Sequence, residues 1–194
     1  MRRLVPRPWP TRQKKDDVER FIKELEVFLE SSIAIWFFDE SGIWVGSKPR
    51  KVLALKGSKP TYPYNGDHIR ITIMGAVNIK TGQLETLLMP TLNTETFQVF
   101  LDYFNTKINK TNIFILDNAS WHKTGRLNWG RIKPVYLPPY SPNLNPIERL
   151  WKILKDLMPI FTEIVNIDEL EEVVITNLKY FFDNPQEVMS ICNI

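Results

Sequence analysis

The sequence predicts an α/β protein built on a mixed sheet, and two apolar segments with a helical stretch between them carry this prediction. Residues 33–38 and 113–116 are unbroken runs of β-branched, aromatic and other apolar residues, and an acidic residue follows each run. Such runs are typical of central strands covered on both faces, as in parallel pairs. Residues 94–108 have helical periodicity and can form the crossover between two parallel strands.

The other elements complete a recognisable order. Their expected ranges are a helix over 16–31, strands over 69–79, 84–89 and 135–137, a short helical piece within 118–128, and helices from 146 to 158, from 167 to 182 and after Pro185. The first strand is expected to end at Asp39 and Glu40 and to be followed by a turn at Ser41 and Gly42. The first three strands read as an antiparallel meander. The order strand, strand, strand, helix, strand, short helix, strand, helix matches the ribonuclease H architecture. We therefore expect an α/β, ribonuclease H-like fold: an antiparallel meander plus parallel strands, flanked by helices.

Length and composition limit the organisation of the chain. With 194 residues, 43% of them hydrophobic, it can build one α/β core with an arm but not two large domains. Residues 1–15 are basic and proline-rich, so we expect a linker or arm there and one domain over 16–194. A single cysteine excludes an internal disulfide. The chain has no signal-peptide core and no apolar run of eighteen residues, so we expect a cytoplasmic protein outside membranes.

Charge is distributed unevenly along the chain. From Asp156 onward there are one base and eight acids, a net charge of 1 − 8 = −7, so the preceding residues carry 3 + 7 = +10. A basic surface favours a polyanionic partner, although a merely solvated, dipolar surface stays open as an alternative. The residues that we expect to contact DNA are Arg2, Arg3, Arg7, Lys48, Arg50, Lys51 and Lys56. The lysines near residue 50 could equally protect an edge strand.

Three acidic residues are candidates for a common site. Asp39 and Asp117 follow the two apolar strands, and parallel neighbours would bring both to the same carboxyl edge of the sheet. Glu148 follows a proline-rich loop and lies in the first turn of a helix that Asn145 and Pro146 are expected to open. An alternative for Glu148 is a capping box, in which its side chain bonds back to Asn145. Converging carboxylates repel one another and are usually neutralised by hard divalent cations, a pair of which commonly serves displacement at phosphorus.

Three motifs then resemble a known family. F-F-D-E-S-G, L-D-N-A-S-W-H and L-P-P-Y-S-P-N-L-N-P-I-E-R-L-W resemble the catalytic domain of mariner-related bacterial insertion-sequence transposases, the insertion-sequence six-thirty family of the DDE superfamily. The resemblance covers roughly residues 33–157. It implies that Asp39, Asp117 and Glu148 are the catalytic, metal-binding triad. It also makes the flanking Glu40, Asn118 and His122 candidates for supporting those ligands, although a histidine at such a position is usually only a solvated loop residue.

The resemblance also implies an activity and its partners. It implies a DNA endonuclease and strand transferase that uses two Mg²⁺ or Mn²⁺ ions, cuts at transposon ends and joins them to target DNA. Its partners would be double-stranded DNA and a second copy of the chain, with which it would form a homodimer. It would act at the nucleoid. The helix-turn-helix region of the family has no counterpart here, so an upstream DNA-recognition chain is a further expected partner. Two alternatives stay open: a structure-selective nuclease of the same fold, and a non-catalytic DNA-binding remnant of a transposase.

Overall fold

The computed structural model describes residues 12–44, 53–59, 61, 69–158, 164 and 166–193. Twelve elements follow one another in the described residues: α1 (Lys15–Glu30), β1 (Ala34–Trp44), β2 (Arg70–Asn78), β3 (Leu84–Met89), α2 (Thr94–Lys107), β4 (Asn112–Leu116), the 3₁₀ helix η1 (Ser120–His122), β5 (Ile132–Tyr136), the 3₁₀ helix η2 (Pro142–Leu144), α3 (Ile147–Leu157), α4 (Ile167–Asp183) and α5 (Pro185–Ile191). Apart from η2, which was not expected, this is the order that the sequence predicts. None of the helices in these ranges is long and apolar enough to cross a membrane.

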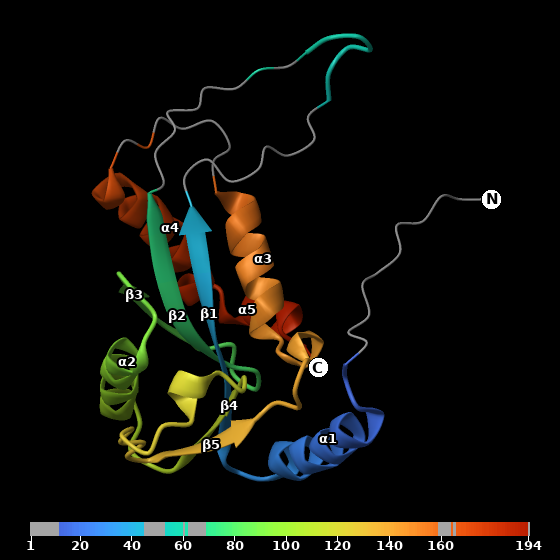
Figure 1. Ribbon diagram of the computed structural model, residues 1–194, viewed down its shortest axis with the longest axis vertical. Helices are drawn as coiled ribbons and strands as arrows, with labels where there is room; N and C mark the ends of the chain where they lie inside the picture. Colours follow the sequence, from blue (N-terminus) through green and yellow to red (C-terminus); the bar gives the residue numbers. More distant parts are fainter. Residues whose placement is uncertain are drawn as a thin grey trace, which may run out of the picture.

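The sheet is mixed, as expected. Its five strands lie in the order β3-β2-β1-β4-β5, with β1 antiparallel to β2 and β2 antiparallel to β3. β4 is parallel to both β1 and β5. The meander and the parallel neighbours that the sequence predicts are both confirmed, and α2 is the crossover that joins the meander to β4 (Figure 1).

Helices cover both faces of the sheet, which explains why its central strands lack a polar face. Along β1, Ile35 and Phe37 pack into a core shared with α1, α3, α4 and α5, whereas Trp36 and Phe38 pack against α2. Side chains alternate between the faces of a strand, so a strand buried on both sides must be apolar at consecutive positions. Figure 1 shows α2 on the opposite side of the sheet from α3.

β1 is longer than the sequence predicts. We expected the strand to end at Asp39 and Glu40 and the chain to turn at Ser41 and Gly42, but β1 runs on to Trp44. Its parallel pairing with β4 stops at Phe37, whereas its antiparallel pairing with β2 continues to the end of the strand. The hydrogen bonds to β2 are sufficient to keep Ser41 and Gly42 extended. Asp39 therefore lies within a strand, just beyond the point where the parallel neighbour ends.

The start of α3 also differs from the prediction. We expected Asn145 to cap this helix, with a capping box to Glu148 as the alternative role of that acid. Instead Pro146 occupies the N-cap position and no side chain caps the helix. Asn145 is buried, and its amide nitrogen donates to the carbonyl oxygen of Phe38 at 3.0 Å. The amide thus ties the start of α3 to β1 one residue before Asp39, a use that local helix rules cannot anticipate because the partner is 107 residues away.

Three contacts hold α3 in place. Trp151 packs against β2 at Gly75, the residue paired with Asp39, where a Cβ would lie only 2.5 Å from the indole ring. On the other side, the buried Cys192 at the end of α5 lies with its Sγ 3.7 Å from the carbonyl oxygen of Pro146. Arg149 also donates to the backbone carbonyl of Asn193. The helix that carries Glu148 is thereby fixed against both the sheet and the C-terminal helix.

The Gly75 contact yields a test of this packing. Gly75→Ala would force a methyl group into the indole of Trp151, and we expect it to lower the free energy of unfolding by about 1–3 kcal/mol, as overpacking usually does. Urea unfolding followed by Trp fluorescence measures the effect. Gly125→Ala is the matched control, because no heavy atom lies within 4 Å of the added Cβ. Equal stability of the two variants would contradict the close packing of Trp151 against Gly75.

Candidate active site

The three acidic residues singled out in the sequence line one pocket of about 360 Å³. Asp39 comes from β1, Asp117 directly follows β4, and Glu148 lies in the first turn of α3. Phe37 pairs with Ile115 across the parallel strands, and the two aspartates stand two residues further along each chain. Since side chains alternate, both aspartates project to the face that α3 covers. The strand register therefore brings Asp39 and Asp117 beneath Glu148.

Like charge and burial disfavour ionisation of two of these acids. The pKa of Asp39 is raised well above its usual value by burial, and also by the negative charges of Glu148, Glu40 and Asp117. Desolvation likewise raises the pKa of Glu148; the nearby Lys155 opposes this rise and Asp117 adds to it. The pocket is thus a place where negative charge accumulates without a full complement of cations. Such a site favours a ligand that brings positive charge.

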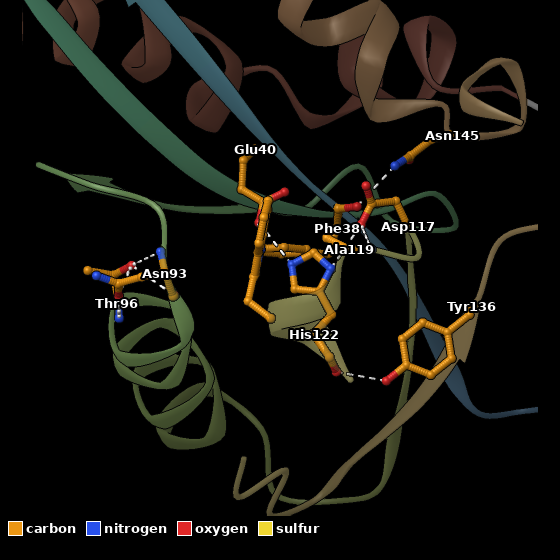
Figure 2. A network of polar contacts seen from close by, with 10 residues as sticks. Phe38, Glu40, Asn93, Thr96, Asp117, Ala119, His122, Tyr136 and Asn145 are labelled. Atoms are coloured by element: carbon orange, nitrogen blue, oxygen red, sulfur yellow. Dashed lines mark hydrogen bonds and ion pairs between the residues drawn. The ribbon is translucent and has the colours of Figure 1, made fainter. Parts of the chain in front are cut away.

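On the α2 side of the sheet, a buried histidine joins two acids. The Nδ1 of His122 lies 2.9 Å from Oδ1 of Asp117, and its Nε2 lies 2.9 Å from Oε1 of Glu40. Figure 2 shows the imidazole between the two carboxylates. Glu40 neighbours Asp39 but projects to the opposite face of β1, so consecutive residues serve the histidine bridge and the pocket. The aromatic rings of Phe38 and Phe97 pack around His122.

The geometry of this bridge indicates a charged imidazole. Both ring nitrogens face carboxylate oxygens, and only the doubly protonated ring can donate to both. Burial acts to lower the pKa of His122, but the hydrogen bonds and charges of Asp117 and Glu40 outweigh it and raise that pKa to about 9. In return, the hydrogen bond from His122 lowers the pKa of Asp117. Asp117 therefore ionises more readily than Asp39.

Asp117 is also fixed in orientation. Its Oδ1 accepts hydrogen bonds from His122 and from the backbone amide of Ala119, the latter at 2.9 Å. Tyr136 on β5 supports the same loop, because its hydroxyl donates to the carbonyl oxygen of His122 at 2.8 Å. With Oδ1 engaged twice, the other oxygen of Asp117 is the one left for a ligand in the pocket.

Asn118 links the neighbouring loops. Its side-chain amide donates to the carbonyl oxygen of Leu137, and its side-chain oxygen accepts from the ammonium of Lys123. The Lys123 ammonium also lies 4.7 Å from the centroid of the Tyr136 ring. Asn118 therefore joins the end of β4 to the start of the proline-rich loop and brings one cation close to the pocket.

The oxygen atoms around the pocket are of the kind that binds a divalent cation, although the carboxylates do not lie close enough together to bind one as they are. Within the described ranges, no three Asp, Glu, His or Cys side chains stand close enough together to hold a metal ion as they are. One further oxygen is suited to metal binding, because Asn145 lines the pocket and its side-chain oxygen is buried without a hydrogen-bond partner. Its amide nitrogen donates to Phe38, so the oxygen is the side-chain atom left for a ligand. Carboxylate and amide oxygens are the ligands that Mg²⁺ and Ca²⁺ prefer.

Comparison with known proteins places the chain in a family. The family described as DDE superfamily endonuclease matches residues 34–171, which include all three acids. The chain belongs to the DDE superfamily of endonucleases. An uncharacterized protein of Sinorhizobium fredii, y4pE/y4sA, is 30% identical over 122 residues, which make up 61% of this chain and 90% of that protein.

Solved structures show the same fold in this DDE endonuclease domain. The Mos1 strand transfer complex superposes with a TM-score of 0.69 at 17% identity and covers 99% of this chain, which spans 64% of the Mos1 chain. The catalytic domain of the Mos1 mariner transposase superposes with a TM-score of 0.55 at 15% identity, covering 97% of this chain and 94% of that domain. At such identities the likeness concerns the fold, and the ribonuclease H-like prediction is confirmed.

The structure brings together most of the predicted site residues of this DDE endonuclease domain. Asp39, Asp117, Glu148 and Asn118 share the pocket, and Glu40 and His122 form the bridge behind it. The solvated-loop alternative for His122 is wrong, because the ring is buried. Among the predicted DNA contacts, Lys56 is described and exposed. Outside the described residues lie Arg2, Arg3, Arg7, Lys48, Arg50 and Lys51.

Two residues of the site were not predicted as such. The sequence predicts Asn145 as a helix cap, and it gives no indication that Lys123 lies near the pocket. The signal for Asn145 was its Asn-Pro dipeptide, which local rules assign to helix capping. Lys123 has no comparable local signal, because its partners Asn118 and Tyr136 come together only in the folded sheet.

The histidine bridge predicts a pH-dependent stability in the metal-free protein. The pKa of His122 is raised from 6.5 to about 9 in the folded state, so its protonation stabilises the fold fully below pH 6.5 and less as the pH rises through about 9. We expect His122→Ala to cost roughly 3 kcal/mol at pH 6 and clearly less at pH 9.5. Urea unfolding of both proteins across this range measures the difference. A difference independent of pH would contradict a charged His122.

Proposed function

We propose that this chain is the catalytic domain of a transposase, which cleaves DNA at the ends of a mobile element and transfers the freed strand to target DNA. The observation that carries the proposal is the convergence of Asp39, Asp117 and Glu148, from three separate elements, in one pocket. Membership of the DDE endonucleases and a fold shared with a transposase catalytic domain support it. The chemistry is hydrolysis of a phosphodiester followed by attack of the 3′-hydroxyl on a second phosphodiester.

In this proposal the three acids hold two Mg²⁺ or Mn²⁺ ions. Solved structures of the Mos1 mariner paired-end complex include one with Mg and one with Mn, which supports these ions as candidates. Bound ions of this kind make the attacking oxygen more nucleophilic and stabilise the leaving oxygen. The protein's own contribution is placement: the strand register aligns Asp39 with Asp117, and α3 brings Glu148 over them.

The neighbouring residues prepare the acids for cation binding. His122 keeps Asp117 ionised and oriented, while Glu40 supplies the second carboxylate that His122 needs. Asp39 has a raised pKa, so cation binding at the site would release a proton when Asp39 is neutral. The side-chain oxygen of Asn145 would complete an oxygen-rich site.

DNA supplies the negative charge that a basic surface attracts. We propose contacts to phosphates by the predicted basic residues of the arm and of the segment near residue 50, and by Lys123 beside the pocket. Phosphate contacts of this kind weaken steeply with salt and carry little sequence information. We propose that the chain acts in the cytoplasm at the nucleoid as a homodimer, with sequence-specific recognition of the element ends by a further segment or chain.

Conservative substitutions test the roles of the acids. Asp117→Asn and Glu148→Gln keep size and hydrogen bonding but remove charge, and we expect each to reduce Mg²⁺-dependent cleavage of a labelled transposon-end duplex at least about 100-fold. Even partners behind the ligands of a metal typically change activity by about 10–100-fold. Glu172→Gln, on the exposed side of α4, is the matched control and should cleave normally. Normal cleavage by Glu148→Gln would rule out a metal-binding role for that residue.

Metal binding separates an active site from a remnant. We expect Mg²⁺ or Mn²⁺ in the millimolar range to raise the melting temperature of the wild-type protein, because a ligand that binds only the folded state stabilises it. Asp117→Asn should lose this stabilisation and Glu172→Gln should retain it. If the wild type gained no stability from either ion and cut no DNA, the chain would be a non-catalytic remnant. Cleavage restricted to branched or hybrid substrates would favour a structure-selective nuclease.

A further inference from the structure

Tyr140, at the rim of the pocket, adopts a backbone conformation that a tyrosine rarely adopts. Its φ is 58°, and it is the only non-glycine residue with positive φ in the described ranges. The left-handed region costs a residue with a Cβ about 1–2 kcal/mol, whereas glycine adopts it without strain. Tyr140 is nevertheless 55% exposed, so core packing does not account for a tyrosine at this position. Strain at an exposed residue beside a proposed active site points to a functional use of the side chain.

The surrounding chain holds this conformation firmly. Pro138, Pro139 and Pro142 fix three φ angles around Tyr140. The neighbouring Ser141 is buried, and its hydroxyl accepts a hydrogen bond from the side-chain amide of Gln13 at 2.7 Å. The exposed ring is therefore presented from a rigid loop, which lowers the entropy lost when a ligand stacks on it.

Two chemically distinct groups of residues line the pocket. Asp39, Asp117 and Glu148 form the acidic group, and the second group consists largely of apolar residues. These are Leu137, Pro138, Pro139, Tyr140 and Pro142. A nucleotide combines the same two kinds of group, a charged phosphate and a flat base whose faces can stack on an aromatic ring. If the phosphate lies at the acids, an adjacent base can contact the apolar group, which includes Tyr140.

A cation lies over the same ring. The guanidinium carbon of Arg12 is 5.8 Å from the centroid of Tyr140. A cation on one face of an aromatic ring is favourable, and it leaves the opposite face for a further planar group. Arg12 is exposed, so it can also pair with a backbone phosphate next to the stacked base.

We propose that Tyr140 and Arg12 form a stacking site for one unpaired DNA base adjacent to the phosphodiester in the pocket. The proposal rests on the proposed function, because it takes DNA as the substrate, and it adds the structural state of that DNA. A base inside a duplex has both faces covered by its neighbours, so a base stacks on Tyr140 only where it has left the duplex or lies at a break in it. The site thus selects DNA that is frayed, nicked or single-stranded beside the reacting phosphate.

The test uses a DNA hairpin with a three-nucleotide 3′ overhang that carries one 2-aminopurine. Stacking on an aromatic side chain quenches this base, and fluorescence anisotropy of a dye at the loop reports binding independently. A blunt hairpin with the 2-aminopurine paired is the reference probe. With the full chain and Mg²⁺, we expect additional quenching of the overhang probe on binding and none for the blunt probe.

Tyr140→Gly is the decisive variant, since glycine adopts the observed φ without strain. It should keep or raise the melting temperature, yet weaken binding of the overhang probe about 5- to 100-fold, the range for loss of one base stack. Its affinity for the blunt probe should change less than about twofold. Tyr140→Phe, which keeps the ring, should bind and quench as the wild type does. Tyr180→Leu removes an exposed tyrosine of α4 that does not line the pocket and serves as the matched control.

Several outcomes would overturn the stacking site. Equal affinity of wild type and Tyr140→Gly for the overhang probe would do so, as would the same quenching with both proteins. Loss of binding in Arg12→Gln with full retention in Tyr140→Gly would show a phosphate contact without a stack. Because quenching reports stacking and not cleavage, a wild type that quenches but never cleaves would contradict the proposed function and leave the stacking site standing.

Discussion

The parallel register between β1 and β4 is the constraint on which the site depends. It places two aspartates side by side at the edge of a sheet whose central strands are apolar on both faces. Such proximity is electrostatically unfavourable, and the raised pKa of Asp39 is its direct expression. The rest of the fold tolerates this cost because burial of the two cores, with α2 on one side and four helices on the other, stabilises the protein enough to offset it.

The pair Asp39 and Glu40 illustrates how one strand serves two networks. Alternation sends Asp39 to the pocket and Glu40 to the opposite face, where it binds His122. The bridge then returns to the pocket through Asp117, around the end of the shorter strand β4. A site on one face of the sheet is thus stabilised electrostatically from the other face. This arrangement is available only where a long strand continues past a short neighbour.

Sequence reasoning succeeded where local signals and global fold agree. The apolar runs identified the central strands, and strand ends with acids identified the pocket, because both follow from burial and from parallel pairing. It failed at Ser41 and Gly42, where pairing with β2 overrides a turn signal, and at Asn145, whose partner Phe38 lies far away in the chain. The role of Glu40 was expected only in outline, since no sequence rule predicts that His122 would be buried between two carboxylates. These misses share one cause: each depends on a contact between distant segments.

Because α5 packs against α3, the three acidic motifs alone do not show whether the pocket of a related chain is intact. Cys192 and Asn193 contact Pro146 and Arg149, the residues on either side of the turn that presents Glu148. A relative that retained all three acidic motifs but had lost its last helix would still be scored as intact by inspection of those motifs. Its glutamate would nevertheless lie on a helix that lacks the packing contacts of α5, and its position relative to the two aspartates would no longer be fixed. The geometry of the acidic pocket therefore depends in part on Cys192 and Asn193, which lie outside the three acidic motifs.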